Sequence, residues 1–274
     1  MLYAILCLLV AYLIGSFPSA LVVGKTAKGI DIREYGSHNL GTTNAIRVLG
    51  KKLGFIVFFL DVFKGVLVVG VARILYDLCK YQIDFSNIEA LKFVLFKPIY
   101  YGLCCVIGHM FPVFAGFRGG KAVATSLGIT LVFAPIPAVL CLLAFAITLE
   151  ATGYVSLSST FAILTVCITA TIQEYVLYKY LGKMGIEVLI LFYTISVFMI
   201  IKHRKNYVRI FKGTEHSFKK KKDNDPFVDD DKKESPKKKM EIMVVENPDD
   251  AKLEIDEYHE LEEIETIEVT DNKE

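Results

Sequence analysis

The chain has 274 residues, of which 53% are hydrophobic, and its mean hydropathy is +0.44. This composition excludes an ordinary soluble domain and indicates an integral membrane protein. The net charge of +1 averages two unlike parts, because residues 1–222 carry 24 Lys and Arg against 10 Asp and Glu, whereas residues 223–274 carry 7 against 20. We therefore expect a basic membrane body followed by an acidic tail.

Long apolar stretches predict an all-α membrane protein, since a helix needs about 20 residues to cross the hydrocarbon core. The N-terminal stretch lacks the cationic start and cleavage site of a secretory signal, so we interpret it as the first span. The six cysteines lack metal-ligand spacing with histidines and are interpreted as small membrane-core residues. The predicted spans are Leu2–Val23, Leu53–Leu78, Leu91–Ile107, Ala122–Leu149, Tyr154–Ile172 and Gly185–Ile201.

The stretch Ala122–Leu149 decides the topology, because Pro135 and Pro137 interrupt it. As a single span, it places the basic segments Gly24–Lys52 and Lys202–Lys222 on opposite faces. As two short spans, it gives seven spans in total and places both basic segments in the cytoplasm, as the positive-inside rule requires. Each half is about 13 residues, or about 20 Å, so some bilayer thinning is needed. We favour seven spans, with an extracytoplasmic N-terminus and a cytoplasmic C-terminus.

The segment Gly108–Lys121 combines glycines with a histidine, an arginine and a lysine between apolar stretches. Glycines let the backbone approach a ligand, and a helix that starts at Ala122 would add the positive end of its dipole. We predict a phosphate site at the membrane surface; a tight turn with snorkelling cations is the alternative. The nucleotide P-loop pattern does not fit, because it needs a glycine at Ala115 and a hydroxyl residue at Ala122.

Two further polar segments flank spans on the same predicted face. The loop Gly36–Arg47 is rich in hydroxyl and amide side chains and ends in Arg47, whose guanidinium can grip a phosphate with two N–H groups. A capped helix start explains the Ser, Thr and Asn residues there, but not the whole cluster. After the last span, His203 and Asn206 lie three residues apart on one helical face, beyond what a positive-inside flank requires.

The second span contains two charged residues, Asp61 and Lys64, three positions apart and hence on one helical face. Charges inside a membrane are costly and usually face a partner or a cavity. We interpret the two residues as an ion pair that fixes helix packing, with direct chemistry as the alternative.

Three separated blocks resemble the motifs of the PlsY family of integral membrane acyltransferases: Gly36–Arg47, Gly108–Thr125 and His203–Glu215. The resemblance covers roughly residues 1–215 and includes the runs Gly15–Ser19, Lys28–Arg33, Leu60–Gly65 and Tyr154–Ser159. It implies seven spans, an extracytoplasmic N-terminus, cytoplasmic motif loops and a place in the cell membrane. It also implies transfer of a fatty acyl group from acyl phosphate to the 1-hydroxyl of glycerol 3-phosphate, which gives 1-acyl-glycerol 3-phosphate and phosphate in the first step of phospholipid synthesis. Neither a cofactor nor a metal is implied.

The resemblance assigns roles to individual residues. The expected catalytic residues are Ser37, Arg47, His203 and Asn206. The expected substrate ligands are Thr43, Asn44, Gly108, Gly119, Gly120, Lys121 and Ser156. Structural roles fall to Glu215 by resemblance and to Asp61 and Lys64 by their spacing.

The sequence departs from the family pattern at a few positions. The family usually has Gly where His38 stands, Ala where Thr42 stands and often Lys where Arg118 stands. It commonly has a cation where Gly153 stands, and losing it weakens the expectation of an anion site in the Tyr154–Ser159 run.

The chemistry leaves two choices open. The substrate proton could pass to a phosphate oxygen or to His203. Ser37 is preferred as a ligand over a covalent nucleophile, because no Ser–His–Asp arrangement is visible. A transporter of a phosphorylated metabolite is the rival function, but its ions would bind near the bilayer midplane, whereas these motifs lie on one face.

Residues 216–274 are predicted to form a charged, disordered cytoplasmic tail. An apolar residue recurs at every third position in Ile255, Tyr258, Leu261, Ile264 and Ile267, so a short amphipathic helix on a protein partner is a further possibility. The other expected partners are the two substrates and the lipid bilayer, and no nucleic acid is expected.

Overall fold

The computed structural model describes residues 2–82 and 97–218, which all belong to one compact unit, Met1–Val228. Every regular element in these residues is helical, as the all-α prediction requires. The long or medium helices are α1 (Leu2–Gly15), α2 (Ser19–Lys28), α3 (Thr42–Leu49), α4 (Lys51–Gln82), α6 (Pro98–Met110), α7 (Val123–Phe133), α8 (Pro135–Thr152), α9 (Val155–Tyr175) and α11 (Ile186–Phe211). Three short elements complete the set: η1 (Ile32–Glu34), η2 (Val113–Ala115) and α10 (Tyr178–Leu181). The predicted tail helix lies outside the described residues.

Five of the described helices are long and apolar enough to cross a membrane, namely α4, α6, α8, α9 and α11. The predicted span Leu2–Val23 is not one continuous helix, because α1 and α2 meet at a bend of 42°. Pro18 causes the break: it has no N–H to donate, and it disfavours helical backbone at Phe17 before it. If this bent pair counts as one span, the described chain has six candidates.

The predicted break within Ala122–Leu149 lies at Ala134, whose extended backbone separates α7 from α8. Pro135 occupies the first position of α8, where its missing N–H costs nothing. The two halves are less equal than expected, with 11 residues in α7 and 18 in α8. A guanidinium N–H of Arg73 donates to the carbonyl of Val132 at 2.7 Å and caps the end of the short α7.

The last helix runs further than its hydropathy predicts. The expected span ends at Ile201, but α11 continues to Phe211 and carries the third motif block on helical backbone. His203 and Asn206 therefore lie on neighbouring turns, as their spacing predicts. The predicted third span also shifts, because α6 begins at Pro98 and residues 91–96 lie outside the described part.

Glycines allow α4 and α7 to pack in close contact. A Cβ on Gly65 would collide with the carbonyl of Thr125, and one on Gly128 would collide with the carbonyl of Val62. Small residues at such crossings allow backbones to pack closely in lipid. Outward-facing large apolar side chains on α4, α8, α9 and α11 remain exposed, as expected for lipid contact.

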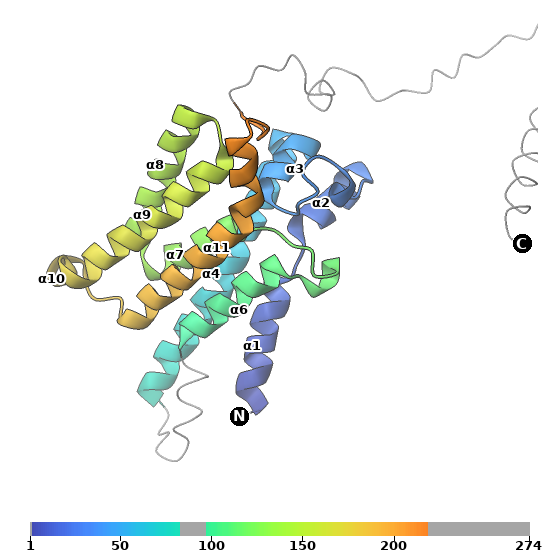
Figure 1. The fold of residues 1–274 in the computed structure, drawn as a ribbon. Helices are drawn as coiled ribbons and strands as arrows, with labels where there is room; N and C mark the ends of the chain where they lie inside the picture. Colours follow the sequence, from blue (N-terminus) through green and yellow to red (C-terminus); the bar gives the residue numbers. More distant parts are fainter. Residues whose placement is uncertain (1, 83–96, 219–274) are drawn as a thin grey trace, which may run out of the picture. The chain divides into compact units, whose positions relative to one another are not determined.

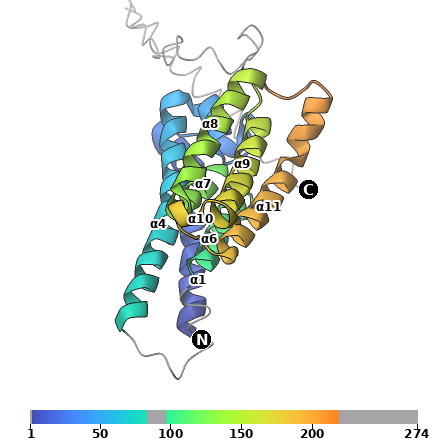
Figure 2. The ribbon, with the colours of Figure 1, turned by 90° about the vertical axis from the view of Figure 1, so that its left-hand side faces the viewer.

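In Figure 1, α3, the turn between α8 and α9, and the last turns of α11 lie at the end of this unit opposite the N-terminus. Figure 2 shows α8 and α9 packed side by side, with α7 behind them. The α3 part of the first polar block and the α11 part of the third are therefore gathered at one end of the helix bundle.

Candidate active site

A cavity of about 750 Å³ extends among α4, α7, α8, α9, α11 and the loop before α3. Ten of the fourteen predicted site residues line it: Ser37, Thr43, Asn44, Arg47, Asp61, Lys121, Ser156, His203, Asn206 and Glu215. The other four do not: Lys64, Gly108, Gly119 and Gly120. Much of the remaining wall is apolar, including Leu127, Leu142, Phe145, Leu149, Ile163, Val166 and Met199.

Asn44 holds the loop that carries Ser37. Its side-chain oxygen accepts a hydrogen bond from the Ser37 backbone N–H at 2.8 Å, and its side-chain nitrogen donates to the carbonyls of Ile32 and Tyr35. The residue is almost fully buried, with 1% of its surface exposed. Its amide is thus already used in shaping the loop, although Asn44 was predicted as a substrate ligand.

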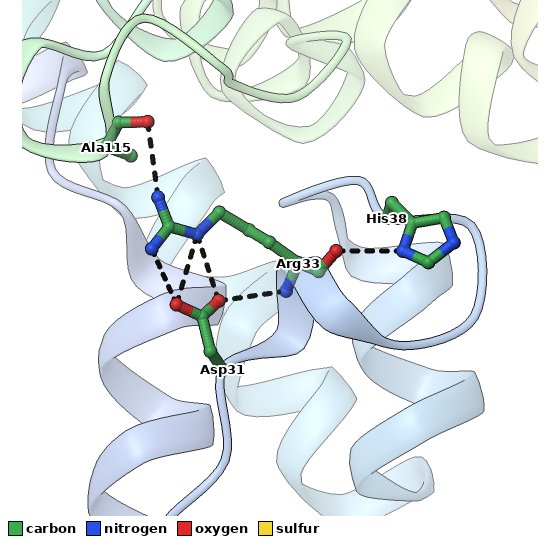
Figure 3. A network of polar contacts seen from close by, with 4 residues as sticks. All are labelled: Asp31, Arg33, His38 and Ala115. Atoms are coloured by element: carbon green, nitrogen blue, oxygen red, sulfur yellow. Dashed lines mark hydrogen bonds and ion pairs between the residues drawn. The ribbon is translucent and has the colours of Figure 1, made fainter. Parts of the chain in front are cut away.

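A second network joins this loop to the Gly108–Lys121 segment (Figure 3). The Arg33 guanidinium contacts the Asp31 carboxylate through two nitrogens and reaches the carbonyl of Ala115 at 3.5 Å. The hydrogen bond from Arg33 lowers the pKa of Asp31 to about 2, so this link stays ionised throughout the neutral range. Two of the predicted motif blocks are therefore fastened together beside the cavity.

His38 explains one departure from the family pattern. Its backbone φ is +57°, in the left-handed region that favours the usual glycine. Its Nδ1 lies 2.8 Å from the carbonyl of Arg33 and must donate to it, because a carbonyl can only accept. That hydrogen bond fixes the ring in its place at the cavity wall (Figure 3).

Lys121 begins a chain of polar contacts that crosses the cavity. Its Nζ donates to the side-chain oxygen of Asn206 at 2.5 Å, and the Asn206 nitrogen donates to Glu215 at 2.6 Å. The other oxygen of Glu215 accepts from Nε of Arg209, also at 2.6 Å. Burial, together with the neighbouring Arg209 and Arg47, lowers the pKa of Lys121 to about 8, although nearby Glu215 acts in the opposite direction.

Sequence reasoning missed Arg209 as part of this group. The signal was present, because Arg209 continues the three-residue spacing of His203 and Asn206 along α11. Arg209 was interpreted only as one of the positive charges that follow the last span.

His203 is 3% exposed and also lines the cavity. Its Nδ1 donates to the carbonyl of Met199 at 2.9 Å, which is one turn earlier in the helix. A neutral His203 consequently carries its proton on Nδ1 and keeps the Nε2 lone pair for another partner. Tyr207 stacks on the ring with centroids 6.2 Å apart and holds its plane.

The predicted glycine ligands have close-packing roles. A Cβ on Gly108 would collide with the carbonyl of Tyr12 in α1, and one on Gly119 or Gly120 would collide with His109. The Gly120 N–H donates to the carbonyl of His109 at 3.1 Å. Gly108 thus lets α6 pack closely on α1, whereas Gly119 and Gly120 let the loop fold back onto the end of α6 just before Lys121.

Asp61 and Lys64 form the predicted ion pair, with 2.9 Å between Nζ and the carboxylate. Ser19 donates to the same carboxylate at 2.8 Å, and Nδ1 of His109 lies 3.6 Å from it. Lys64 also donates to the carbonyl of Phe17, at the bend between α1 and α2. The cluster thus ties α2, α4, α6 and the bend before α2 together at the cavity wall, which Asp61 and His109 line.

The segment that follows α11 returns to the cavity wall. The backbone N–H of Phe218 donates to the carbonyl of Gly153 at 2.9 Å, and His216 and Phe218 line the cavity. Gly153 ends α8 with a φ of +75°, so a glycine suits the position where the family commonly has a cation. Within residues 2–82 and 97–218, no group of three His, Cys, Asp or Glu residues could hold a metal ion.

Comparisons with known proteins identify this arrangement. The family model described as "Glycerol-3-phosphate acyltransferase" matches residues 5–213. The chain belongs to that family. Among its curated relatives, the glycerol-3-phosphate acyltransferase of Bacillus velezensis is 43% identical over 80% of this chain and 99% of its own length. Those of Bacillus subtilis and Staphylococcus carnosus are 42% and 39% identical over 80% and 78% of this chain, and over 99% and 98% of their own lengths.

Solved structures agree with this membership. The crystal structure of PlsY, an integral membrane glycerol 3-phosphate acyltransferase in its glycerol 3-phosphate form, is 34% identical. It matches 79% of this chain and 96% of its own, with a TM-score of 0.64. The predicted PlsY resemblance is thereby confirmed: this chain is a multi-pass membrane acyltransferase of phospholipid synthesis. Membership favours the acyltransferase over the rival transporter.

Proposed function

We propose that the protein transfers a fatty acyl group from acyl phosphate to the 1-hydroxyl of glycerol 3-phosphate, as the first step of phospholipid synthesis at the cell membrane. The observation that carries this proposal is the composition of the cavity, which joins a cationic, hydroxyl-rich part to a long apolar wall. Such a cavity suits a ligand that carries a phosphate on an alkyl chain. The names of the relatives supply glycerol 3-phosphate as the acceptor.

The phosphates of the two substrates bind at the cationic part. Arg47 and Lys121 supply positive charge, and the hydroxyls of Ser37, Thr43 and Ser156 supply hydrogen-bond donors. The Ser156 hydroxyl is buried and has no hydrogen-bond partner among the described residues, so a ligand oxygen can complete it. The first turn of α7 also lies in the wall, and its free N–H groups add the positive end of the helix dipole.

In the reaction, the 1-hydroxyl oxygen of glycerol 3-phosphate attacks the acyl carbonyl carbon. An ester C–O bond forms, the bond between the carbonyl carbon and the phosphate oxygen breaks, and the electron pair leaves with the phosphate. The hydroxyl proton passes to Nε2 of His203 or to the departing phosphate. Acyl phosphate is already activated, so positioning and charge neutralisation account for most of the rate enhancement.

Ser37 acts as a ligand in this scheme. Its N–H is held by Asn44, and the residue lines the cavity, where its hydroxyl can donate to a substrate phosphate. Asn206 orients Lys121 through their direct hydrogen bond, and Glu215 fixes Asn206 in turn. The scheme requires no cofactor and no metal.

The proposed topology has seven spans and an extracytoplasmic N-terminus. It is supported by the five long helices, the bent pair α1–α2 and the short apolar α7. With that count, the three motif blocks share the cytoplasmic face, which agrees with the positive charge of the segments that carry them. A protein partner for the acidic tail remains a prediction, because the tail lies outside the described residues.

The test supplies purified protein in detergent with palmitoyl phosphate and labelled glycerol 3-phosphate. We expect labelled 1-acyl-glycerol 3-phosphate from acyl phosphate and not from acyl-CoA or acyl carrier protein. Arg47→Ala should abolish most of this activity, whereas Arg204→Ala, which removes an exposed arginine outside the cavity wall, should not. Normal activity of a folded Arg47→Ala variant, or no product from any donor, would refute the proposal.

A further inference from the structure

Ser126 is a buried hydroxyl that the proposed mechanism has not yet used. It lies on α7, is 3% exposed and lines the cavity. Its Oγ has no hydrogen-bond partner among the described residues. Thr130, one turn further along the same helix, also lines the cavity, but its hydroxyl donates to the carbonyl of Ser126 at 2.8 Å. A buried polar atom without a partner is costly, so an unpaired hydroxyl in a cavity wall indicates a ligand atom that completes it.

The position of Ser126 along α7 indicates which part of the ligand its hydroxyl contacts. The cavity-lining residues of this helix include Val123, Ser126, Leu127 and Thr130, which have the spacing of one helical face. Lys121 lies just before the helix at the cationic part, and Ser126 follows the first helical residue, Val123, by three positions, or about 4.5 Å along the axis. Further along this face of α7, Leu127 is apolar and the Thr130 hydroxyl is already paired with the helix backbone. Ser126 therefore marks the change from the cationic to the apolar part.

Only one polar group of an acyl phosphate lies between its phosphate and its alkyl chain, and that group is the carbonyl. We propose that Oγ of Ser126 donates a hydrogen bond to the carbonyl oxygen of the acyl group. The bond strengthens as the carbonyl carbon is attacked and negative charge develops on this oxygen. Ser126 is thus a catalytic residue of the acyl transfer. The inference rests on the proposed acyl phosphate donor.

Ser126→Ala tests the assignment, with Ser158→Ala as the matched control. Ser158 is equally buried, but its hydroxyl donates to the carbonyl of Tyr154 at 2.9 Å and it does not line the cavity. With palmitoyl phosphate, Ser126→Ala should lower kcat on the order of 10²-fold and leave the KM for glycerol 3-phosphate within about twofold. Ser158→Ala should leave kcat close to that of the unmodified protein.

Two further measurements separate the carbonyl contact from other roles. Hexadecyl phosphate has the phosphate and the chain but no carbonyl, so its inhibition constant should be the same for Ser126→Ala and the unmodified protein. The Tm of Ser126→Ala should not fall, because the change removes an unpaired polar atom. A weaker inhibition by hexadecyl phosphate would assign Ser126 to the phosphate instead, and a lower Tm with lost activity would assign it to the fold.

The proposed function and this inference can fail separately. If the unmodified protein makes no product from palmitoyl phosphate, the proposed donor is wrong. If it does, and Ser126→Ala retains normal kcat, the donor stands and the carbonyl contact is overturned.

Discussion

Replacing Asp61 with asparagine tests whether the buried charge cluster supports the fold or takes part in chemistry. Asp61 is 1% exposed, and its carboxylate neutralises Lys64, which is itself only 5% exposed. The substitution leaves the Lys64 ammonium buried without a counter-charge, with only neutral acceptors, namely the new amide oxygen and the carbonyl of Phe17. Removing one partner of a buried ion pair destabilises a protein by about 3–5 kcal/mol.

This magnitude predicts a large shift in thermal unfolding. For a unit of about 200 residues, a loss of 1 kcal/mol lowers Tm by about 2–4 °C, so Asp61→Asn should lower Tm on the order of 10 °C. The double variant Asp61→Asn/Lys64→Met removes both charges and should recover most of the loss. Asp77→Asn, an exposed change on the same helix, should have little effect.

A thiol-reactive fluorescent dye provides the assay, because Cys105, Cys141 and Cys167 are buried and become reactive only on unfolding. Acyl transfer at 25 °C is measured on the same samples. If the double variant is as unstable as Asp61→Asn, the ion pair is not what stabilises this region. If it is as stable as the unmodified protein but inactive, Asp61 takes part in the chemistry, which its place in the cavity wall would permit.

Three further predictions follow from the site. The pKa of Lys121 is lowered to about 8, so its positive charge is present below that pH and is lost above it. The KM for glycerol 3-phosphate should therefore rise up to about tenfold per pH unit above pH 8. The variant Lys121→Arg should show a flatter dependence of KM on pH between pH 7 and 9.5. Gly120→Ala places a methyl group against His109 and should lower Tm by several degrees. Gly70→Ala, which has open space at its Cβ in α4, should leave Tm unchanged or raise it in the same thermal unfolding scan. Glu215→Ala removes the acceptor of Asn206 and Arg209 and should lower the free energy of unfolding by about 2 kcal/mol. Glu150 is an exposed glutamate on α8, and an equal loss in Glu150→Ala would show that the two contacts of Glu215 do not cause the effect.

Local patterns in the sequence predicted several features of this structure. The break between α7 and α8 follows from Pro135, whose chemistry is the same in any fold. The ion pair of Asp61 and Lys64 follows from helical spacing and the cost of lone charges in a membrane. Parity of the spans, together with positive charge, predicts that the polar blocks share one membrane face, and α3 and the last turns of α11 do lie at one end of the bundle.

Other features depend on tertiary contacts that a sequence does not display. Gly119 and Gly120 have the composition of an anion loop, but their lack of a side chain is explained by the closeness of His109. Asn44 has the chemistry of a ligand, yet its partners are backbone groups of a loop up to twelve positions away. Hydropathy ended the last span at Ile201, because it reports contact with lipid and not the continuation of α11 along a polar cavity.

The short α7 connects the fold to the electrostatics of the site. Because the helix has only 11 residues, its N-terminal turn and Lys121 lie in the cavity wall, and the positive end of its dipole is placed there too. Burial is the main cause that lowers the pKa of Lys121; Arg209 and Arg47 lower it further, and Glu215 acts in the opposite direction. The charged form of Lys121 is thus disfavoured by burial and by repulsion from Arg47 and Arg209. A phosphate dianion removes that repulsion, so relief of strain among the protein's own cations contributes to its binding free energy.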